Sequence, residues 1–104
     1  MKLHLTAALA AVAAAALATS AMAADPVVAK LSAATKGATK PVAGGAVFEC
    51  LGDVCAARTP SSDTATVRGC KELVRQVGAV SAFGPGSKQL SAEQLASCNE
   101  SARK

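Results

Sequence analysis

The stretch "VFECLGDVC", residues 47–55, places two cysteines on either side of a central Gly-Asp pair. A two-residue loop with glycine first is typical of a type II′ β-hairpin turn. Leu51 and Val54 then close the turn, and Cys50 and Cys55 face each other one step back as a non-hydrogen-bonded pair. Such pairs hold their Cα atoms about 4.5 Å apart, which is near the short end of disulfide geometry. The stretch therefore predicts a hairpin closed by a cross-strand disulfide.

A helix is predicted over residues 67–78, which follow a loop rich in Pro, Ser, Asp and Thr at 58–66. Its apolar side chains recur at i, i+3, i+4 and i+7, the spacing of one helical face; they are Cys70, Leu73, Val74 and Val77. Gly78 is a natural residue to follow the helix C-terminus.

Residues 79–90 read as two short strands, or as one strand and a return, around a Gly-Pro-Gly turn. A second helix is predicted to begin at Ser91, because Ser91 and Gln94 form the pattern of a capping box. Glu93 is well placed for the helix dipole. Asn99 is expected to end this helix in a left-handed conformation.

The chain has four cysteines, and four cysteines allow three pairings. We rank Cys50–Cys55 with Cys70–Cys98 first, since the start of the first helix meets the end of the second if the helices pack antiparallel. The other two pairings would tie the hairpin to the helices and stay open. A zinc site would need two close cysteine pairs, and a thiol-redox site would favour C-x-x-C, so we interpret the cysteines as structural disulfides.

The first 23 residues are typical of a secretory signal peptide. Lys2 gives a positive start, residues 5–18 are apolar, and Ala21 and Ala23 stand at the −3 and −1 positions of a cleavage site. The alternative is an uncleaved membrane anchor, although the segment is mostly the weakly hydrophobic alanine. The chain is therefore expected to be exported, to the periplasm or outside the cell, with no stable membrane insertion after cleavage.

After cleavage the chain divides into two predicted parts. Residues 24–45 are rich in Ala, Lys, Thr and Gly and are expected to form a flexible leader; a short helix over 28–36 is the alternative. Residues 46–104 are expected to form a small α+β domain in the order hairpin, helix, short hairpin or strand, helix. Its large apolar residues are few, so the disulfides are expected to stabilise it, with Phe48 and Phe83 in the core.

Three segments together resemble a family of small exported proteins of unknown function from Gram-negative bacteria. They are "GGAVFECLGDVC", "CKELVRQVGAVSAF" and "LSAEQLASCN", and the resemblance extends over about residues 43–100, nearly the whole predicted folded part. The chain departs from the family pattern at Phe48, where tryptophan is the more frequent residue. The resemblance implies the exported location and the four-cysteine framework, and it implies no activity.

The predicted mature chain lacks the residues on which the common catalytic arrangements depend. The one histidine, His4, lies in the signal peptide, so a Ser-His-Asp or Cys-His arrangement cannot be built, and the usual imidazole metal ligand is missing. No phosphate-binding glycine loop occurs. We therefore predict no catalytic, cofactor-binding or metal-binding residues, and we expect a protein that is not an enzyme.

One helical stripe is a candidate interaction surface. Arg68, Lys71 and Arg75 stand at i, i+3 and i+7, and the predicted mature chain, with ten basic and seven acidic residues, has a net charge of +3. A partner would be an envelope protein or an anionic envelope surface; nucleic acid is disfavoured, since no aromatics interleave the charges. The function expected is a non-catalytic binding or structural module, and the alternatives are a secreted inhibitor or toxin-like effector, or an enzyme.

Overall fold

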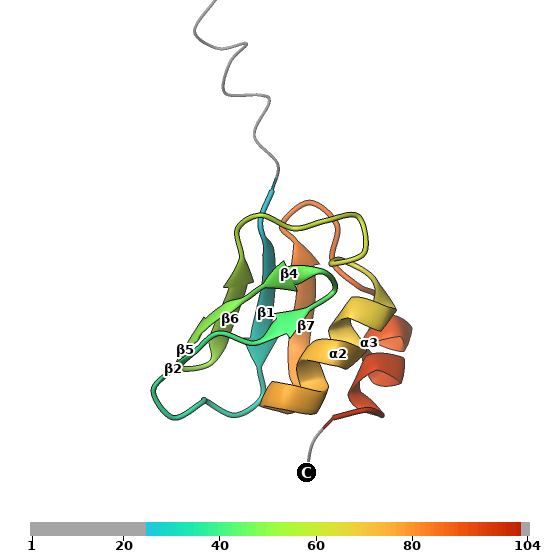
Figure 1. The fold of residues 1–104 in the computed structure, drawn as a ribbon. Helices are drawn as coiled ribbons and strands as arrows, with labels where there is room; N and C mark the ends of the chain where they lie inside the picture. The colour runs from blue at the N-terminus through green and yellow to red at the C-terminus, as the bar shows by residue number, and fades with distance from the viewer. Residues whose placement is uncertain (1–24, 103–104) are drawn as a thin grey trace, which may run out of the picture.

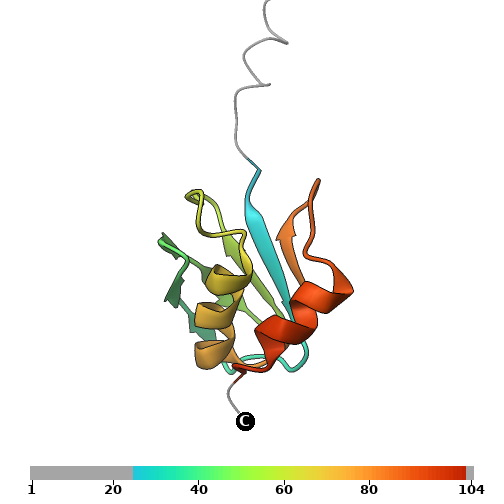
Figure 2. The same ribbon diagram turned by 90° about the vertical axis from the view of Figure 1, so that its right-hand side faces the viewer.

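The computed structural model describes residues 25–102. The predicted signal peptide, with Ala21 and Ala23, lies outside the described residues. The described part is a small α+β fold, as predicted, in which two helices lie across one face of a curved antiparallel sheet (Figures 1 and 2). The elements are β1 Val27–Leu31, β2 Ala38–Thr39, β3 Val42–Ala43, β4 Ala46–Val47, β5 Glu49–Leu51, β6 Val54–Ala57, α2 Val67–Val77, β7 Val80–Pro85 and α3 Ala92–Asn99.

The main sheet has five strands in the order β2-β5-β6-β1-β7, and every neighbouring pair is antiparallel. β1 is an interior strand, with β6 on one side and β7 on the other. The sequence order hairpin, helix, strand, helix predicted for residues 46–104 corresponds to β5, β6, α2, β7 and α3. No helix within residues 25–102 combines the length and the apolar character needed to cross a membrane.

The prediction of a flexible leader over residues 24–45 is wrong from Val27 onward, and the alternative helix over 28–36 is wrong too. Val27, Ala29 and Leu31 are buried on one face of β1 while the residues between them are exposed. This is the period of a strand with one face in the core. The conformational entropy lost when β1 becomes ordered is offset because β1 has a hydrogen-bonded neighbouring strand on each side. The composition of the segment alone does not indicate these two partners.

β2 and β3 form one strand of a long hairpin whose other strand is β4 and β5. Ala38 lies opposite Leu51, and Val42 lies opposite Val47, in one continuous register. Pro41 interrupts the ladder because proline has no N–H to donate, yet its carbonyl oxygen still accepts the Phe48 N–H at 2.8 Å. Residues 38–51 are therefore one continuous hairpin, although β2 with β5 and β3 with β4 belong to separate sheets.

The tip of the long hairpin is fixed against α2. Gly44 has φ of +57°, and a Cβ there would lie 2.7 Å from the Thr64 Cα, so both the turn and the close approach require glycine. Its N–H donates to the Glu72 carboxylate at 2.7 Å, and its carbonyl oxygen accepts hydrogen bonds from the hydroxyls of Thr64 and Ser61 at 2.7 and 3.0 Å. The tip is thus held between the loop before α2 and α2 itself.

The hairpin predicted from residues 47–55 is confirmed. Cys50 lies opposite Cys55 in the β5–β6 register and is bonded to it, with the two Cα atoms 4.0 Å apart. The pairing of Cys70 with Cys98 is confirmed as well, and it joins the first turn of α2 to the last turn of α3. All four cysteines are buried, so both disulfides are part of the core.

The core lies between the sheet and the two helices. Phe48 and Phe83 are fully buried with ring centroids 6.2 Å apart, and Leu73 and Val74 of α2 pack in the same cluster. The interpretation of both phenylalanines as core residues is therefore confirmed. Beyond β7 the chain makes one return, in which the Leu90 N–H donates to the Phe83 carbonyl oxygen at 2.9 Å.

The two helix ends predicted from the sequence have different outcomes. The capping box of Ser91 and Gln94 is present, and Gly78 follows the end of α2. The left-handed Asn99 is wrong, because Asn99 is the last helical residue of α3 and the cap residue Glu100 is right-handed. Asn99 uses its side chain elsewhere: the amide donates to the Val80 carbonyl oxygen and accepts the Val80 N–H, both at 2.9 Å.

Candidate functional site

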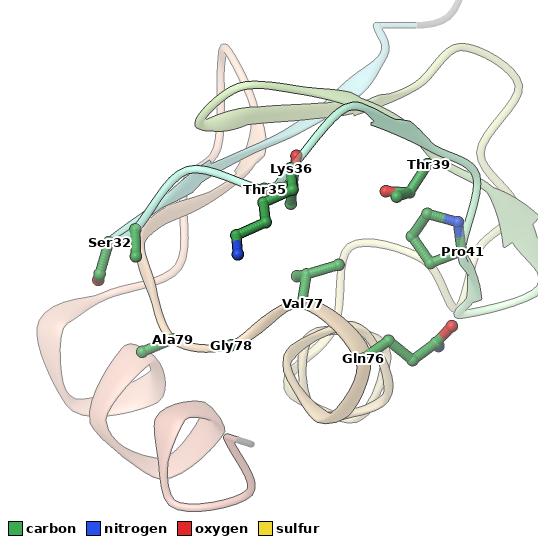
Figure 3. Close-up of a pocket in the computed structure, with 10 residues that line it drawn as sticks. Ser32, Thr35, Lys36, Thr39, Pro41, Gln76, Val77, Gly78 and Ala79 are labelled. Carbon is green, nitrogen blue, oxygen red and sulfur yellow. The ribbon is translucent and has the colours of Figure 1, made fainter. Parts of the chain in front are cut away.

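An open groove lies beside the C-terminal end of α2, and we call it the α2-end groove. It has a volume of about 760 Å³. Figure 3 shows its walls, formed by the loop between β1 and β2, by the β2–β3 strand of the long hairpin, and by the last turn of α2 with the two residues after it. The lining residues are Ser32, Ala33, Thr35, Lys36, Thr39, Pro41, Gln76, Val77, Gly78 and Ala79.

The loop of residues 32–37 is anchored to two other segments of the chain. The Ser32 N–H donates to the Ala79 carbonyl oxygen at 2.9 Å, so the loop begins tied to the segment that precedes β7. Thr35 donates its N–H and its hydroxyl to the Gly52 carbonyl oxygen at 2.8 and 3.1 Å. Gly52 belongs to the hairpin turn that Cys50 and Cys55 close, so the cross-strand disulfide also supports this wall of the groove.

The opposite wall is the end of α2. Gly78, with φ of +93°, ends the helix and donates its N–H to the Val74 carbonyl oxygen at 2.9 Å. Gln76 reaches from the last turn to the long hairpin, where its side-chain amide donates to the Val42 carbonyl oxygen at 2.9 Å. This bond links the helix wall to the strand wall at one end of the groove.

The side chains that line the groove are mostly small, apolar or hydroxyl-bearing, and one of them is charged. Val77, Ala79 and Pro41 offer apolar surface, and Lys36 is the charged residue among the described lining residues. Figure 3 shows the Lys36 nitrogen directed from the loop into the space above the end of α2. The groove therefore offers apolar surface and one positive charge to a ligand.

The predicted basic stripe falls on another part of α2. Arg68, Lys71 and Arg75 line one shallow depression of about 480 Å³, so the fold does bring their side chains to one surface. Glu72 lies among them, however, and its carboxylate is 3.9 Å from the Arg68 guanidinium. The stripe is thus a mixed surface, less basic than the spacing of its three cations alone indicates.

No group of three or more His, Cys, Asp or Glu side chains suited to a metal ion occurs among the residues that the structure describes. The four cysteines all belong to disulfides.

Sequence reasoning missed the α2-end groove because it missed the strand that forms one wall. The signal that would have found this strand is "VAGGAV", residues 42–47, in which two apolar residues mirror each other across two glycines. Two glycines between such segments are typical of a hairpin with a primed turn. Extending that register outward places residues 38 and 51 opposite each other, and so defines the whole long hairpin.

Comparison with known proteins gives one positive result. No curated protein and no solved structure matches the chain significantly. A family model described as a family of unknown function, DUF8200, matches residues 6–100. Its match includes the hairpin with its disulfide, both helices and every residue of the α2-end groove. The chain belongs to the DUF8200 family.

Proposed function

We propose that this protein is an exported, non-catalytic module that binds a partner in the α2-end groove. The observation that carries the proposal is the groove itself, whose volume of about 760 Å³ lies within the usual range for ligand sites, about 300–1,000 Å³. Its loop is anchored by backbone hydrogen bonds at Ser32 and Thr35. A wall of that kind needs little ordering when a partner binds, which favours affinity.

Export is supported by the disulfides. Cys50–Cys55 and Cys70–Cys98 use every cysteine of the chain, and such bonds persist in oxidising compartments such as the periplasm or the cell exterior. They are compatible with the signal peptide proposed for residues 1–23. We place the partner in the same compartment, as a protein or anionic component of the envelope rather than a nucleic acid.

A binding role without catalysis is supported by the chemistry of the lining. The lining residues offer two threonine hydroxyls, one serine hydroxyl, one amide and one ammonium group. Figure 3 shows the Ser32 hydroxyl directed away from the Lys36 nitrogen, which does not favour a Ser-Lys nucleophile pair. The secreted inhibitor or toxin-like effector stays an alternative prediction.

The basic stripe is a second candidate surface, for an anionic envelope component. Arg68, Lys71 and Arg75 share one depression on α2, and exposed cations attract anionic surfaces over long range. Glu72 in the same depression offsets part of that attraction, so we place the groove first.

Photo-crosslinking in cells distinguishes these surfaces. A benzophenone amino acid is placed in the full chain at Thr39 for the groove, at Lys71 for the stripe, and at Ala96 on the exposed side of α3 as the matched control. We expect one adduct of defined mass from Thr39 and none from Ala96. An adduct from Lys71 alone would move the binding site to the stripe, and adducts from neither position in the producing cells would contradict the proposal.

A further inference from the structure

The two edges of the main sheet differ in how far other groups of the protein cover their backbone. At the β7 edge, the Asn99 side chain occupies both the N–H and the carbonyl oxygen of Val80, at 2.9 Å each. Farther along, the Leu90 N–H donates to the Phe83 carbonyl oxygen, and Pro85 has no N–H to offer. The β7 edge is therefore covered by groups of the protein, as sheet edges in soluble proteins usually are.

The other edge belongs to the β2–β3 strand of the long hairpin. Because the Phe48 N–H donates to the Pro41 carbonyl oxygen, Pro41 and every second residue from it face their hairpin partner. Ala38, Lys40 and Val42 then turn their backbone groups to the outside. The bond from Gln76 to the Val42 carbonyl oxygen, at 2.9 Å, confirms that this outside faces the end of α2.

Gln76 meets this edge at Val42. Within residues 25–102, no group of the protein occupies the outward backbone positions of Ala38 and Lys40. Thr39 and Pro41, which alternate with them, turn their side chains into the α2-end groove. Open backbone donors and acceptors thus run along the side of a groove whose opposite wall offers the apolar surface of Val77.

We propose that this open edge accepts the C-terminal tail of a partner polypeptide as an added antiparallel strand, with its α-carboxylate bound by Lys36. The inference deepens the proposed function and rests on it. An added strand lies about 4.8 Å from the edge and gains main-chain hydrogen bonds at alternate residues. Its other residues direct side chains toward Val77 and Ala79, which favours apolar residues at every second position.

We propose a C-terminal tail because of the direction in which an antiparallel added strand would run. A strand antiparallel to β2 and β3 runs from Val42 toward Ala38, so its C-terminus arrives beside Lys36. The loop of residues 32–37 lies at that end and contributes Ser32, Ala33 and Thr35 to the lining. A chain that stops there fits better than one that continues, and the carboxylate at its end is complementary to the Lys36 ammonium group.

The test uses the full chain recovered with both disulfides formed, and synthetic hexapeptide pools as the probe. The pools carry valine or leucine at the last, third-last and fifth-last positions and mixed residues between them. One pool has a free C-terminal carboxylate and the matched pool a C-terminal amide. Peptides retained by the immobilised protein are identified by mass spectrometry, and the best is titrated into isotope-labelled protein while its amide resonances are followed by NMR.

We expect retained peptides from the carboxylate pool, with the largest resonance shifts at Ala38 to Lys40. Amidation should weaken binding about tenfold, as expected for loss of a charge-assisted hydrogen bond. Lys36→Gln should weaken the carboxylate peptide by the same factor and leave the amidated peptide unchanged. The matched control Lys88→Gln removes an equal charge from the exposed turn after β7 and should change neither.

Methylation of single peptide nitrogens tests the added strand directly. It should abolish binding at alternate positions and be tolerated at the positions between, because every second N–H faces the edge. Equal sensitivity at every position, or none, would overturn strand addition even if the groove binds its ligand. Failure of every pool to shift the resonances of residues 38–40 would also overturn it, whereas the crosslink from Thr39 tests the proposed function separately.

Discussion

Substitution of Asn99 by alanine is expected to destabilise the fold by about 2–3 kcal/mol. Each of the two hydrogen bonds between the Asn99 side chain and the Val80 backbone contributes about 1 kcal/mol net, and both are 2.9 Å long. Val80 is only 2% exposed, so its N–H and carbonyl oxygen cannot turn fully to water after the substitution. These unpaired groups add up to about 1 kcal/mol to the cost of the two lost bonds.

Urea unfolding of the oxidised protein, followed by circular dichroism, measures this loss. For a domain of this size the loss corresponds to a fall in Tm of about 8–24 °C, with little change in the denaturant slope. Gln89→Ala is the matched control, because the Gln89 amide also donates to the β7 backbone, at 2.8 Å to the Pro85 carbonyl oxygen, but is exposed. We expect the control to cost about 0.5 kcal/mol, within the range of surface substitutions.

Asn99→Asp adds a pH test of the same contact. The introduced carboxylate can accept the Val80 N–H, but it repels the Val80 carbonyl oxygen until it takes up a proton and can donate to it. The folded state therefore binds that proton more tightly than the unfolded state, and the variant should gain stability relative to the wild type as the pH falls. Equal stability of Asn99→Ala and Gln89→Ala, or a difference between Asn99→Asp and wild type that is constant with pH, would refute the reasoning.

Further substitutions test the hairpin tip and the two disulfides. Gly44→Ala should cost about 3 kcal/mol in the same unfolding assay, because residue 44 has a left-handed φ and the new Cβ would lie 2.7 Å from the Thr64 Cα. Gly37 also has a left-handed φ but has open space around it, so Gly37→Ala should cost about 1 kcal/mol. Thr64→Val removes a buried hydroxyl bonded to the Gly44 carbonyl oxygen at 2.7 Å and should cost about 2 kcal/mol; a loss below that of Gly37→Ala would contradict the role given to the hairpin tip. Replacing the interhelical disulfide by two serines should cost about 3.6 kcal/mol, against about 2.2 for the hairpin disulfide, because it closes the longer loop. The reverse order of unfolding midpoints would show that loop length does not control the contributions of the two disulfides.

The features that the sequence predicted correctly depend on short-range geometry. The hairpin with its disulfide follows from Cys50 and Cys55 being separated by a two-residue turn and one flanking residue on each side. The capping box follows from the spacing of Ser91 and Gln94. Each of these needs no knowledge of distant partners, so local stereochemistry was enough.

The features that the sequence missed depend on partners far along the chain. β1 has only five residues, and its middle buried residue is Ala29, which is only weakly hydrophobic. The alternation of apolar and polar residues that indicates a strand is therefore weak in this segment. Its stability comes from β6 and β7, which lie more than 20 residues away along the chain. Asn99 was missed for the same reason, since a residue at a helix end reads as a cap unless the strand beside it is known.

The placement of the groove follows from how the fold closes its sheet. α3 supplies Asn99 to cover the β7 edge, and the Cys70–Cys98 disulfide holds α3 against α2. With both helices on one side of the sheet, α2 bonds to the long hairpin through Glu72 at the Gly44 tip and through Gln76 at Val42. The remaining edge, at Ala38 and Lys40, is the one that the helices are too short to cover. A longer α2 would cover this edge and would also fill the groove. The open edge and the open groove therefore both result from the position at which α2 ends.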